Sequence, residues 1–243
     1  MFGPSHTHLQ PLSHAVSVAR MQEIDATAIH TVGIPRLLLM EHAGVALARS
    51  AQSLVSPPTR PILVCCGTGF NGGDGLSAAR HLHHWGYSLT VVVMGSLASL
   101  REEPAVYANI LRRLGLALIQ GSSDDTLAQL TPSLTEHALI IDTLLGIGVR
   151  GVVRAPLASV IDAMNRSGLP IVSADIPSGL NGDTGRVQGI AVKATVTVAF
   201  GLPKQGCLLQ DGPAHVGSLV IDPITIPHTL LAEALHGHSR CAR

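Results

Sequence analysis

The feature of this sequence that most limits its possible folds is an alternation of short apolar runs with longer segments of helical spacing. Runs of strand length lie at 61–66, 88–95, 116–121, 138–142, 170–175, 194–201 and 217–227. Helical spacing of apolar residues fills 18–33, 35–54, 73–86, 101–115, 124–134 and 155–168. Because strands joined by helices pair in parallel, the pattern predicts an α/β fold. We expect a mostly parallel central sheet with helices on both faces.

The composition fits one large domain with a substantial core. Of 243 residues, 46% are apolar and 13% are charged, a balance that disfavours general disorder. Basic and acidic residues number 16 each, and no basic stripe is present, which argues against nucleic acid as a partner. The apolar runs are too short to span a membrane. Residues 1–17 lack the basic and apolar segments of a signal peptide.

The four cysteines form neither a disulfide framework nor a zinc motif, which fits a reducing compartment. We therefore expect a cytoplasmic protein. Its domain is predicted to span 18–228, between a flexible N-terminal tail at 1–17 and a C-terminal tail at 229–243.

A glycine-rich stretch, "GTGFNGGDG", follows the first predicted strand at 67–75. Gly67, Gly69 and Gly72 satisfy the G-x-G-x-x-G pattern of dinucleotide-binding loops. A dehydrogenase of that type needs an acid after its second strand, which here ends in "VVVMG". A P-loop needs lysine and serine or threonine where Gly73 and Asp74 stand. Neither interpretation fits, so an ordinary NAD-dependent dehydrogenase is disfavoured.

The distinctive part of this stretch runs from Asn71 to Gly75. Its glycines allow a ligand to approach the backbone closely and permit positive φ angles. The amide of Asn71 offers both a donor and an acceptor. Asp74 is expected to open the next helix, where a carboxylate caps free N–H groups. The simpler alternative is a tight turn with a capping aspartate.

Two further predicted strands end in an acid, Asp142 and Asp175, each followed by a glycine-containing loop. Ligands of open α/β sheets bind beyond the carboxyl ends of the strands. An acid after an apolar run costs stability unless it is paired, hydrogen-bonded or bound to an ion. A single such aspartate indicates a cap or a turn, but three such loops together favour one ligand-binding crevice.

The candidate loops carry oxygen ligands. The histidines of "HLHHWG" lack the spacing of a zinc pair, so packing or surface positions are expected for them. Asn71, Asp142 and Ser178 are oxygen donors from the three loops. Such donors suit a hard cation.

Five motifs, in order, resemble the YjeF N-terminal domain family, the NAD(P)H-hydrate epimerases: "LLLMEHAG", "NGGDGLSAARHL", "IDTLLGIGVRG", "ADIPSGLNGDTG" and "FGLPKQG". The resemblance runs from about Val18 to Pro227. It implies a Rossmann-like αβα sandwich, commonly a homodimer, that interconverts the R and S epimers of NADHX and NADPHX. An ATP- or ADP-dependent NAD(P)HX dehydratase then restores the cofactor. Because the chain ends at Arg243, a separate dehydratase is expected.

The resemblance also implies site residues. Its potassium ligands fall on Asn71, Asp142 and Ser178. Its substrate contacts fall on Phe70, Asn71, Gly72, Gly73, Asp74, Gly146, Ile147, Gly148, Val149, Arg150, Gly151, Val152 and Asp175.

The sequence departs from the family pattern at two positions. Phe70 stands where asparagine is usual, which removes one polar group but leaves a backbone contact. Thr195 stands where aspartate is common. Neither change touches the three implied potassium ligands.

Inverting the hydrated carbon requires a proton to be delivered to an oxygen and removed again. Our hypothesis from the sequence is that Asp142 is the acid–base group. The alternative is that Asp142 only ligates the ion. Lys204 either balances charge or is a surface lysine in a turn. A non-catalytic nucleotide- or protein-binding module remains the second interpretation, although a pure scaffold would not need Asn71, Asp142, Asp175 and Ser178.

Overall fold

The computed structural model describes residues 15–55, 60–121 and 134–236, and its described strands form one seven-stranded sheet. All of its strand pairs are parallel. The strands are β1 (Ile62–Cys66), β2 (Leu89–Met94), β3 (Leu118–Gly121), β4 (Leu139–Thr143), β5 (Ile171–Ala174), β6 (Val196–Phe200) and β7 (Ser218–Asp222). The prediction of a mostly parallel α/β sheet is confirmed.

The strand order explains where a ligand can bind. The sheet runs β3-β2-β1-β4-β5-β6-β7, so its first six strands have the order of a Rossmann fold. The chain moves outward from β1 to β3, then returns to β4 and moves the other way. β1 and β4 are therefore neighbours whose following loops diverge, and their register pairs Cys66 with Thr143. This topological switch point is where open α/β sheets bind ligands.

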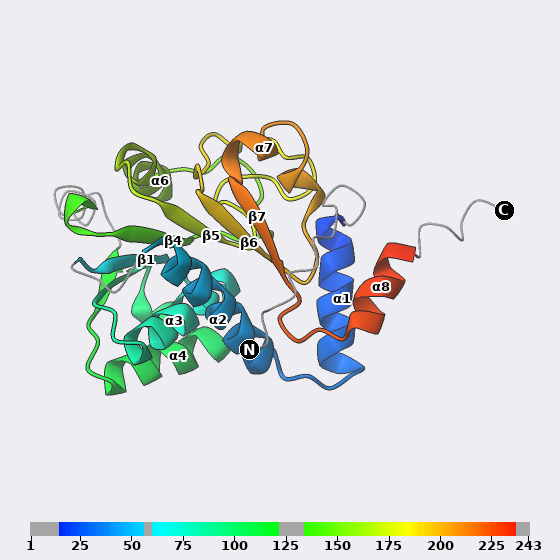
Figure 1. Ribbon diagram of the computed structural model, residues 1–243, viewed down its shortest axis with the longest axis horizontal. Helices are drawn as coiled ribbons and strands as arrows, with labels where there is room; N and C mark the ends of the chain where they lie inside the picture. The colour runs from blue at the N-terminus through cyan, green and yellow to red at the C-terminus, as the bar shows by residue number, and fades with distance from the viewer. Residues whose placement is uncertain (1–14, 56–59, 122–133, 237–243) are drawn as a thin grey trace.

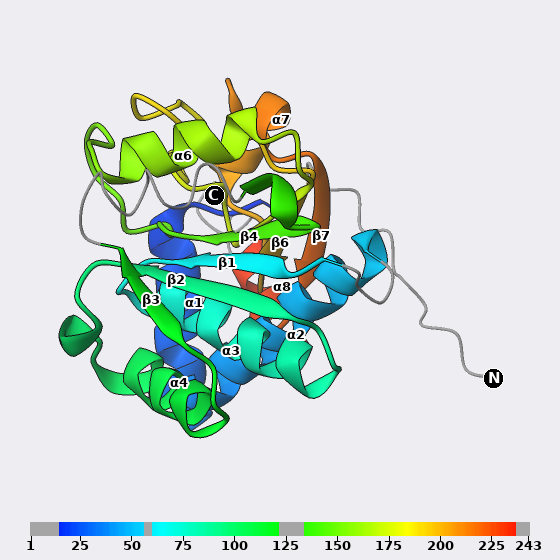
Figure 2. The same cartoon turned by 90° about the vertical axis from the view of Figure 1, so that its left-hand side faces the viewer.

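Helices cover both faces of the sheet (Figures 1 and 2). One face carries α1 (Val18–His30), α2 (Arg36–Leu54), α3 (Phe70–His84), α4 (Glu102–Arg113) and α8 (His228–His236). The other face carries α6 (Leu157–Arg166). The short α7 (Gly212–His215) follows β6.

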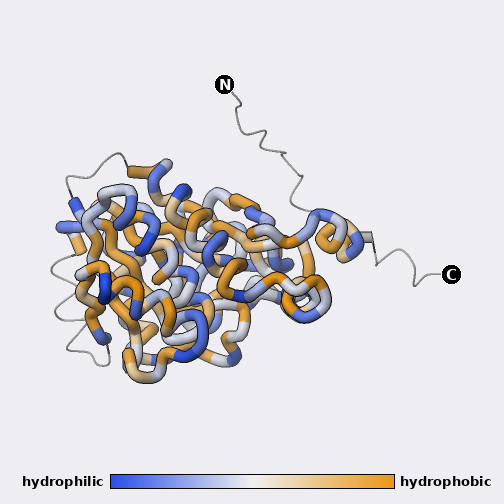
Figure 3. Tube along the Cα trace, turned by 90° about the horizontal axis from the view of Figure 1, so that it is seen from below, coloured by the Kyte–Doolittle hydropathy of each residue, from blue (hydrophilic) through white to orange (hydrophobic). Residues whose placement is uncertain are grey.

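The two cores follow from strand periodicity. In β1, Ile62, Val64 and Cys66 pack with the helices of the first face, while Leu63 and Cys65 pack with α6. Alternate side chains of a strand point to opposite faces, so a strand that is covered on both sides is apolar throughout. Polar and apolar stretches alternate along the described part of the chain (Figure 3). Among the described residues, no helix has both the length and the apolarity needed to cross a membrane.

The structure differs from the predictions at both ends of the domain. Val16, assigned to a flexible tail, is buried and pairs with the segment around Lys204, accepting a hydrogen bond from the Gln205 amide at 2.9 Å. Residues 229–236, assigned to the C-terminal tail, belong to α8, which packs against α1. The domain therefore includes both segments, because their apolar side chains complete the first core. Residues 1–14 and 237–243 and most of the helix predicted at 124–134 lie outside the described residues.

Candidate active site

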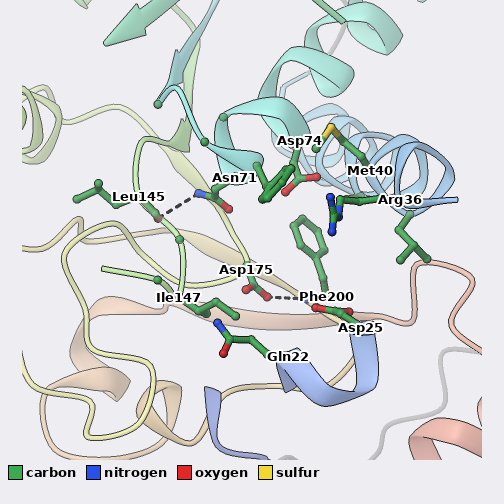
Figure 4. Close-up of a pocket in the computed structure, with 18 of the residues that line it drawn as sticks. Gln22, Asp25, Arg36, Met40, Asn71, Asp74, Leu145, Ile147, Asp175 and Phe200 are labelled. Carbon is green, nitrogen blue, oxygen red and sulfur yellow. Dashed lines mark hydrogen bonds between the residues drawn. The ribbon is translucent and has the colours of Figure 1, made fainter. Parts of the chain in front are cut away.

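A cavity of about 630 Å³ lies beyond the carboxyl ends of β1, β4, β5 and β6. This volume is within the usual range for small-molecule sites. The loops after β1 and β4 form one side, and helices α1 and α2 close the other. The polar groups that converge on it include Asp25, Arg36, Asn71, Asp74 and Asp175 (Figure 4). Lys204 also lines it.

The first turn of α3 forms one wall of this cavity. The helix begins at Phe70, three residues before the predicted start, with Gly69 as its N-cap and no side-chain cap. The prediction that Asp74 caps the helix is therefore wrong. Asp74 is the fifth helical residue, and its carboxyl lies in the cavity wall instead.

The glycines of this segment act by close approach. None of Gly67, Gly72, Gly73 and Gly75 has a positive φ, so that part of the expectation is wrong. A Cβ at Gly72 would lie 2.0 Å from the Gly67 carbonyl oxygen, and one at Gly75 would lie 2.1 Å from Thr143 Oγ1. Both positions require glycine because α3 packs directly against the ends of β1 and β4.

Asp142, at the end of β4, is fully buried beside the cavity and is not part of its lining. Its Oδ1 accepts from Ser178 Oγ at 2.6 Å, and its Oδ2 accepts from Ser173 Oγ at 2.8 Å and from the Ser178 amide at 3.0 Å. Burial raises the pKa of Asp142, and the hydrogen bonds from Ser178 oppose this rise. This geometry favours the alternative assignment for Asp142, an ion ligand and loop anchor, over direct contact with a substrate.

The three predicted potassium ligands meet around the backbone of Leu145. Asn71 Nδ2 donates to the Leu145 carbonyl at 3.0 Å (Figure 4). Ser178 Oγ lies 3.2 Å from the same oxygen. With Asp142 bound to Ser178, the group offers carboxylate, hydroxyl and carbonyl oxygens, and the Asn71 amide adds another if it is turned over. Such a donor set fits a hard monovalent cation. Elsewhere in the described chain, no three histidine, cysteine or acidic side chains are arranged to hold a metal ion.

Asp175 and Lys204 form an ion pair inside the cavity. Lys204 is only 1% exposed, so its interpretation as a surface lysine is wrong. Its Nζ donates to Asp175 Oδ1 and, at 2.9 Å, to the Phe200 carbonyl. Asp175 has a φ of 64°, a conformation that non-glycine residues rarely adopt, and the Phe200 amide donates to the same Oδ1 at 3.1 Å. This strained backbone at the end of β5 is held by its partners, as is common at functional sites.

The sequence analysis did not identify Asp25. It lies on α1 next to Met21, Ile24 and Ala28, the buried face of that helix, and it reaches the cavity from there. Burial raises the pKa of Asp25 to about 6, and Asp175 adds to this rise while Lys204 and Arg36 oppose it. An acid beside the apolar stripe of an amphipathic helix is the sequence feature that could have revealed it.

Phe70 stands at the rim of the cavity and is 48% exposed. The guanidinium carbon of Arg36 lies 4.6 Å from the centre of its ring, a cation–π contact. Arg36 also forms an ion pair with Glu102 at 3.1 Å. The residue that departs from the family pattern is thus held between the ends of α2 and α3.

Most, but not all, of the predicted substrate residues line the cavity. The lining includes Phe70, Asn71, Gly72, Asp74, Gly146, Ile147, Gly148, Val149 and Asp175. Gly73 packs toward Met40, and Arg150, Gly151 and Val152 lie on exposed chain beyond the lining. The segment after β4 therefore contributes its first half to the site.

A parallel sheet in Rossmann order, with a polar cavity at its switch point, defines a Rossmann-like ligand-binding α/β protein. A family model described as "YjeF-related protein N-terminus" matches residues 36–206. The chain belongs to this family.

Three similar proteins illustrate the relationship. An NAD(P)H-hydrate epimerase of Limosilactobacillus fermentum is 37% identical, over 85% of this chain and 95% of that protein. A bifunctional NAD(P)H-hydrate repair enzyme of Pyrobaculum aerophilum is 43% identical over 81% of this chain. The match covers 39% of that enzyme's length, so the chain spans about two-fifths of it. The crystal structure of the yeast protein ynu0 superposes with a TM-score of 0.77 at 23% identity, covering 90% of this chain and 93% of that one, which shows the same fold.

Proposed function

We propose that this protein is an NAD(P)H-hydrate epimerase, an isomerase that interconverts the R and S epimers of NADHX and NADPHX. The observation that carries the proposal is a nucleotide-sized cavity at the switch point of the sheet whose wall holds several carboxyl groups. The epimerase of Limosilactobacillus fermentum, matched over almost its whole length, supports this choice of reaction.

The reaction needs groups that move protons. The hydrate carries its hydroxyl on a carbon bonded to the ring nitrogen, so inversion breaks and remakes a bond at that carbon. A positioned carboxyl group can deliver and remove the proton that this requires. We assign substrate binding to Asp175 and to the cavity-lining parts of the segments after β1 and β4, around Asn71 and Gly146.

We further propose that a potassium ion binds between Asn71, Asp142 and Ser178. When bound, the ion supplies positive charge beside a fully buried carboxylate and fixes the loops that line the cavity. Asp142 then positions these loops and does not itself exchange protons with the substrate. The short hydrogen bonds between Asp142 and Ser178 support this assignment.

The functional partner that we propose is an ATP- or ADP-dependent dehydratase that uses the S epimer. Relatives that are named as bifunctional repair enzymes, and that this chain matches over about two-fifths of their length, support a second activity in the same repair. A homodimer and a cytoplasmic location are also proposed. Cys65, Cys66 and Cys207 are buried free thiols, which agrees with a reducing compartment. Analytical ultracentrifugation tests the dimer.

The test of the activity is the conversion of purified R-NADHX, coupled to an S-specific dehydratase, in potassium and then in sodium. We expect the protein to accelerate epimerisation, and Asp175→Asn, which removes the ion pair with Lys204 in the substrate-holding part of the cavity, to raise KM for NADHX. Asp162→Asn is the matched control, because Asp162 pairs with Arg166 on the surface of α6. Equal rates in the two salts would refute the potassium site.

The second candidate, a non-catalytic binding module, predicts no acceleration by a correctly folded protein. Circular dichroism of the same sample checks the fold. The carboxyl groups in the cavity favour the enzyme, because such groups can move the protons that inversion of the hydrated carbon requires.

A further inference from the structure

Three carboxyl groups from separate elements reach the same cavity. Asp25 comes from α1, Asp74 from α3 and Asp175 from the end of β5 (Figure 4). The Lys204 ammonium forms an ion pair with Asp175. Within the described residues, neither Asp25 nor Asp74 has a hydrogen bond or an ion pair with another side chain. Two carboxyl groups are therefore left to interact with whatever occupies the cavity.

The surroundings of these two carboxyls push their proton affinities apart. Asp25 faces Asp175, Lys204 and Arg36, and burial with these charges raises its pKa to about 6. Burial raises the pKa of Asp74 well above its usual range, and Asp175 and Asp25 add to this rise while Lys204 opposes it. Asp25 has two cations and one carboxyl group nearby, whereas Asp74 has two carboxyl groups and one cation, so Asp74 holds its proton more tightly than Asp25. Paired carboxyls with separated proton affinities are the mark of an acid and a base in one site.

Two simpler explanations fit less well. A cation site would draw the carboxyls together, but no three acidic, histidine or cysteine side chains of the described chain are arranged around a common point for a metal. A purely structural role would give each acid of the cavity wall a protein partner. Asp175 follows that rule, whereas Asp25 and Asp74 do not.

We propose that Asp74 and Asp25 are the acid and the base of the epimerisation and act from the α3 side and the α1 side of the substrate ring. This inference rests on the proposed function. It goes beyond it by assigning the chemistry to two carboxyl groups, one of which, Asp25, lies on the N-terminal helix.

Loss of water from one face of the ring and addition of water to the other face invert the hydrated carbon. Protonated Asp74 gives its proton to the hydroxyl oxygen, the C–O bond breaks with its electron pair on oxygen, and water leaves. The lone pair of the ring nitrogen forms a C=N bond to the same carbon. A second water adds to the opposite face of this carbon, the electrons of the C=N bond return to nitrogen, and the Asp25 carboxylate takes the proton of that water. One water is released and one is consumed.

The reverse epimerisation exchanges the two roles. After one turnover Asp74 is ionised, because its proton left with the first water, and Asp25 is protonated by the second water; exchange with solvent resets the pair. The intermediate carries a positive charge on the ring, and the surplus of carboxyl groups over cations in this part of the cavity stabilises it.

The test compares Asp25→Asn and Asp74→Asn with Glu23→Gln, a control on the same helix as Asp25 whose side chain is 65% exposed and pairs with Arg20. We expect each aspartate variant to lower kcat at least about 100-fold with KM changed less than about threefold. Glu23→Gln should keep the wild-type kcat. Circular dichroism shows that each variant is folded, and fluorescence titration with NADP⁺ shows that it still binds a dinucleotide.

Two further readouts separate this mechanism from a structural role. The kcat/KM of the wild type should rise as pH increases through about 6, and Asp25→Asn should lose this limb. In ¹⁸O-labelled water, the S epimer that the enzyme forms should carry the label, because the C–O bond is broken.

These experiments separate failure of the two-carboxyl mechanism from failure of the proposed epimerase activity. If the wild type accelerates epimerisation and Asp25→Asn retains its kcat and its pH limb, or if the product keeps its original oxygen, the two-carboxyl mechanism is wrong but the epimerase stands. If the wild type gives no acceleration at all, both fall together.

Discussion

The raised pKa of Asp25 makes a prediction about stability that needs no substrate. In the unfolded chain this carboxyl has the ordinary value of 3.8, and in the native cavity it has a value of about 6. Replacing Asp25 by Asn keeps the shape of the side chain and removes its charge. The variant should therefore be more stable than the wild type wherever the native carboxylate is ionised.

The size and sign of the effect follow from linkage. Native Asp25 binds its proton more tightly than unfolded Asp25, so its contribution to stability is fully present below pH 3.8 and is lost as pH rises through about 6. At about 1.4 kcal/mol for each pH unit, the loss reaches about 3 kcal/mol. For a chain of this length, this corresponds to a Tm difference of about 6–12 °C at pH 8.

Urea denaturation of the wild type and Asp25→Asn, from about pH 4 to pH 8, measures this difference directly. We expect similar unfolding free energies at the acid end and a variant that is up to about 3 kcal/mol more stable at the basic end. Glu23→Gln should follow the wild type throughout, because Glu23 is exposed. A pH-independent difference, or a variant that is less stable at pH 8, would contradict the assignment of a poorly compensated charge to Asp25.

Variants around the cavity give three further tests. Phe70→Asn removes the ring that Arg36 covers, and steady-state kinetics should show KM for NADHX raised about two- to fivefold at constant kcat. Gly75→Ala places a Cβ 2.1 Å from the buried Thr143 hydroxyl and should lower Tm by at least about 5 °C in a thermal scan. The control is Gly148→Ala, whose Cβ meets nothing within 4 Å and which should leave Tm unchanged. Asp142→Asn disrupts a buried group of hydrogen bonds and should lower the unfolding free energy, measured in urea, by about 1–3 kcal/mol. An unchanged free energy would contradict a stabilising role for these hydrogen bonds.

The sequence was sufficient to predict the layers of the fold and the edge at which the site lies. Each described strand overlaps a predicted apolar run. The inner strands β1, β4, β5 and β6 are buried at every position, and strands buried on both faces are mostly apolar. The ends of β4 and β5 were recognised from Asp142 and Asp175, acids placed directly after apolar runs. Their positions beside the glycine-rich segment follow from parallel pairing, which brings carboxyl ends to one edge.

What the sequence could not give was the direction in which each acid points. Asp142 and Asp175 look alike in sequence, since each ends a strand. Yet the Asp142 carboxylate lies outside the cavity lining and accepts hydrogen bonds from a hydroxyl and a backbone amide. Asp175 instead faces the cavity beside Lys204. Asp74 was mistaken for a cap because α3 starts at Phe70, ahead of the glycines, which rarely lie inside helices. In each case a tertiary contact decided what local preference could not.

The N-terminal helix α1 brings the Asp25 carboxyl group to the cavity, although it lies outside the alternation of strands and helices. α1 precedes the first strand, so nothing in the Rossmann topology requires it at the carboxyl edge. It is held there by the buried residues Met21, Ile24 and Ala28 on one side and by α8 on the other. This packing gives a rigid support for Asp25, whose charged form opposes folding. In the proposed mechanism the helix supplies the base, and the free energy of the large core beneath it offsets the cost of ionising Asp25 in the cavity.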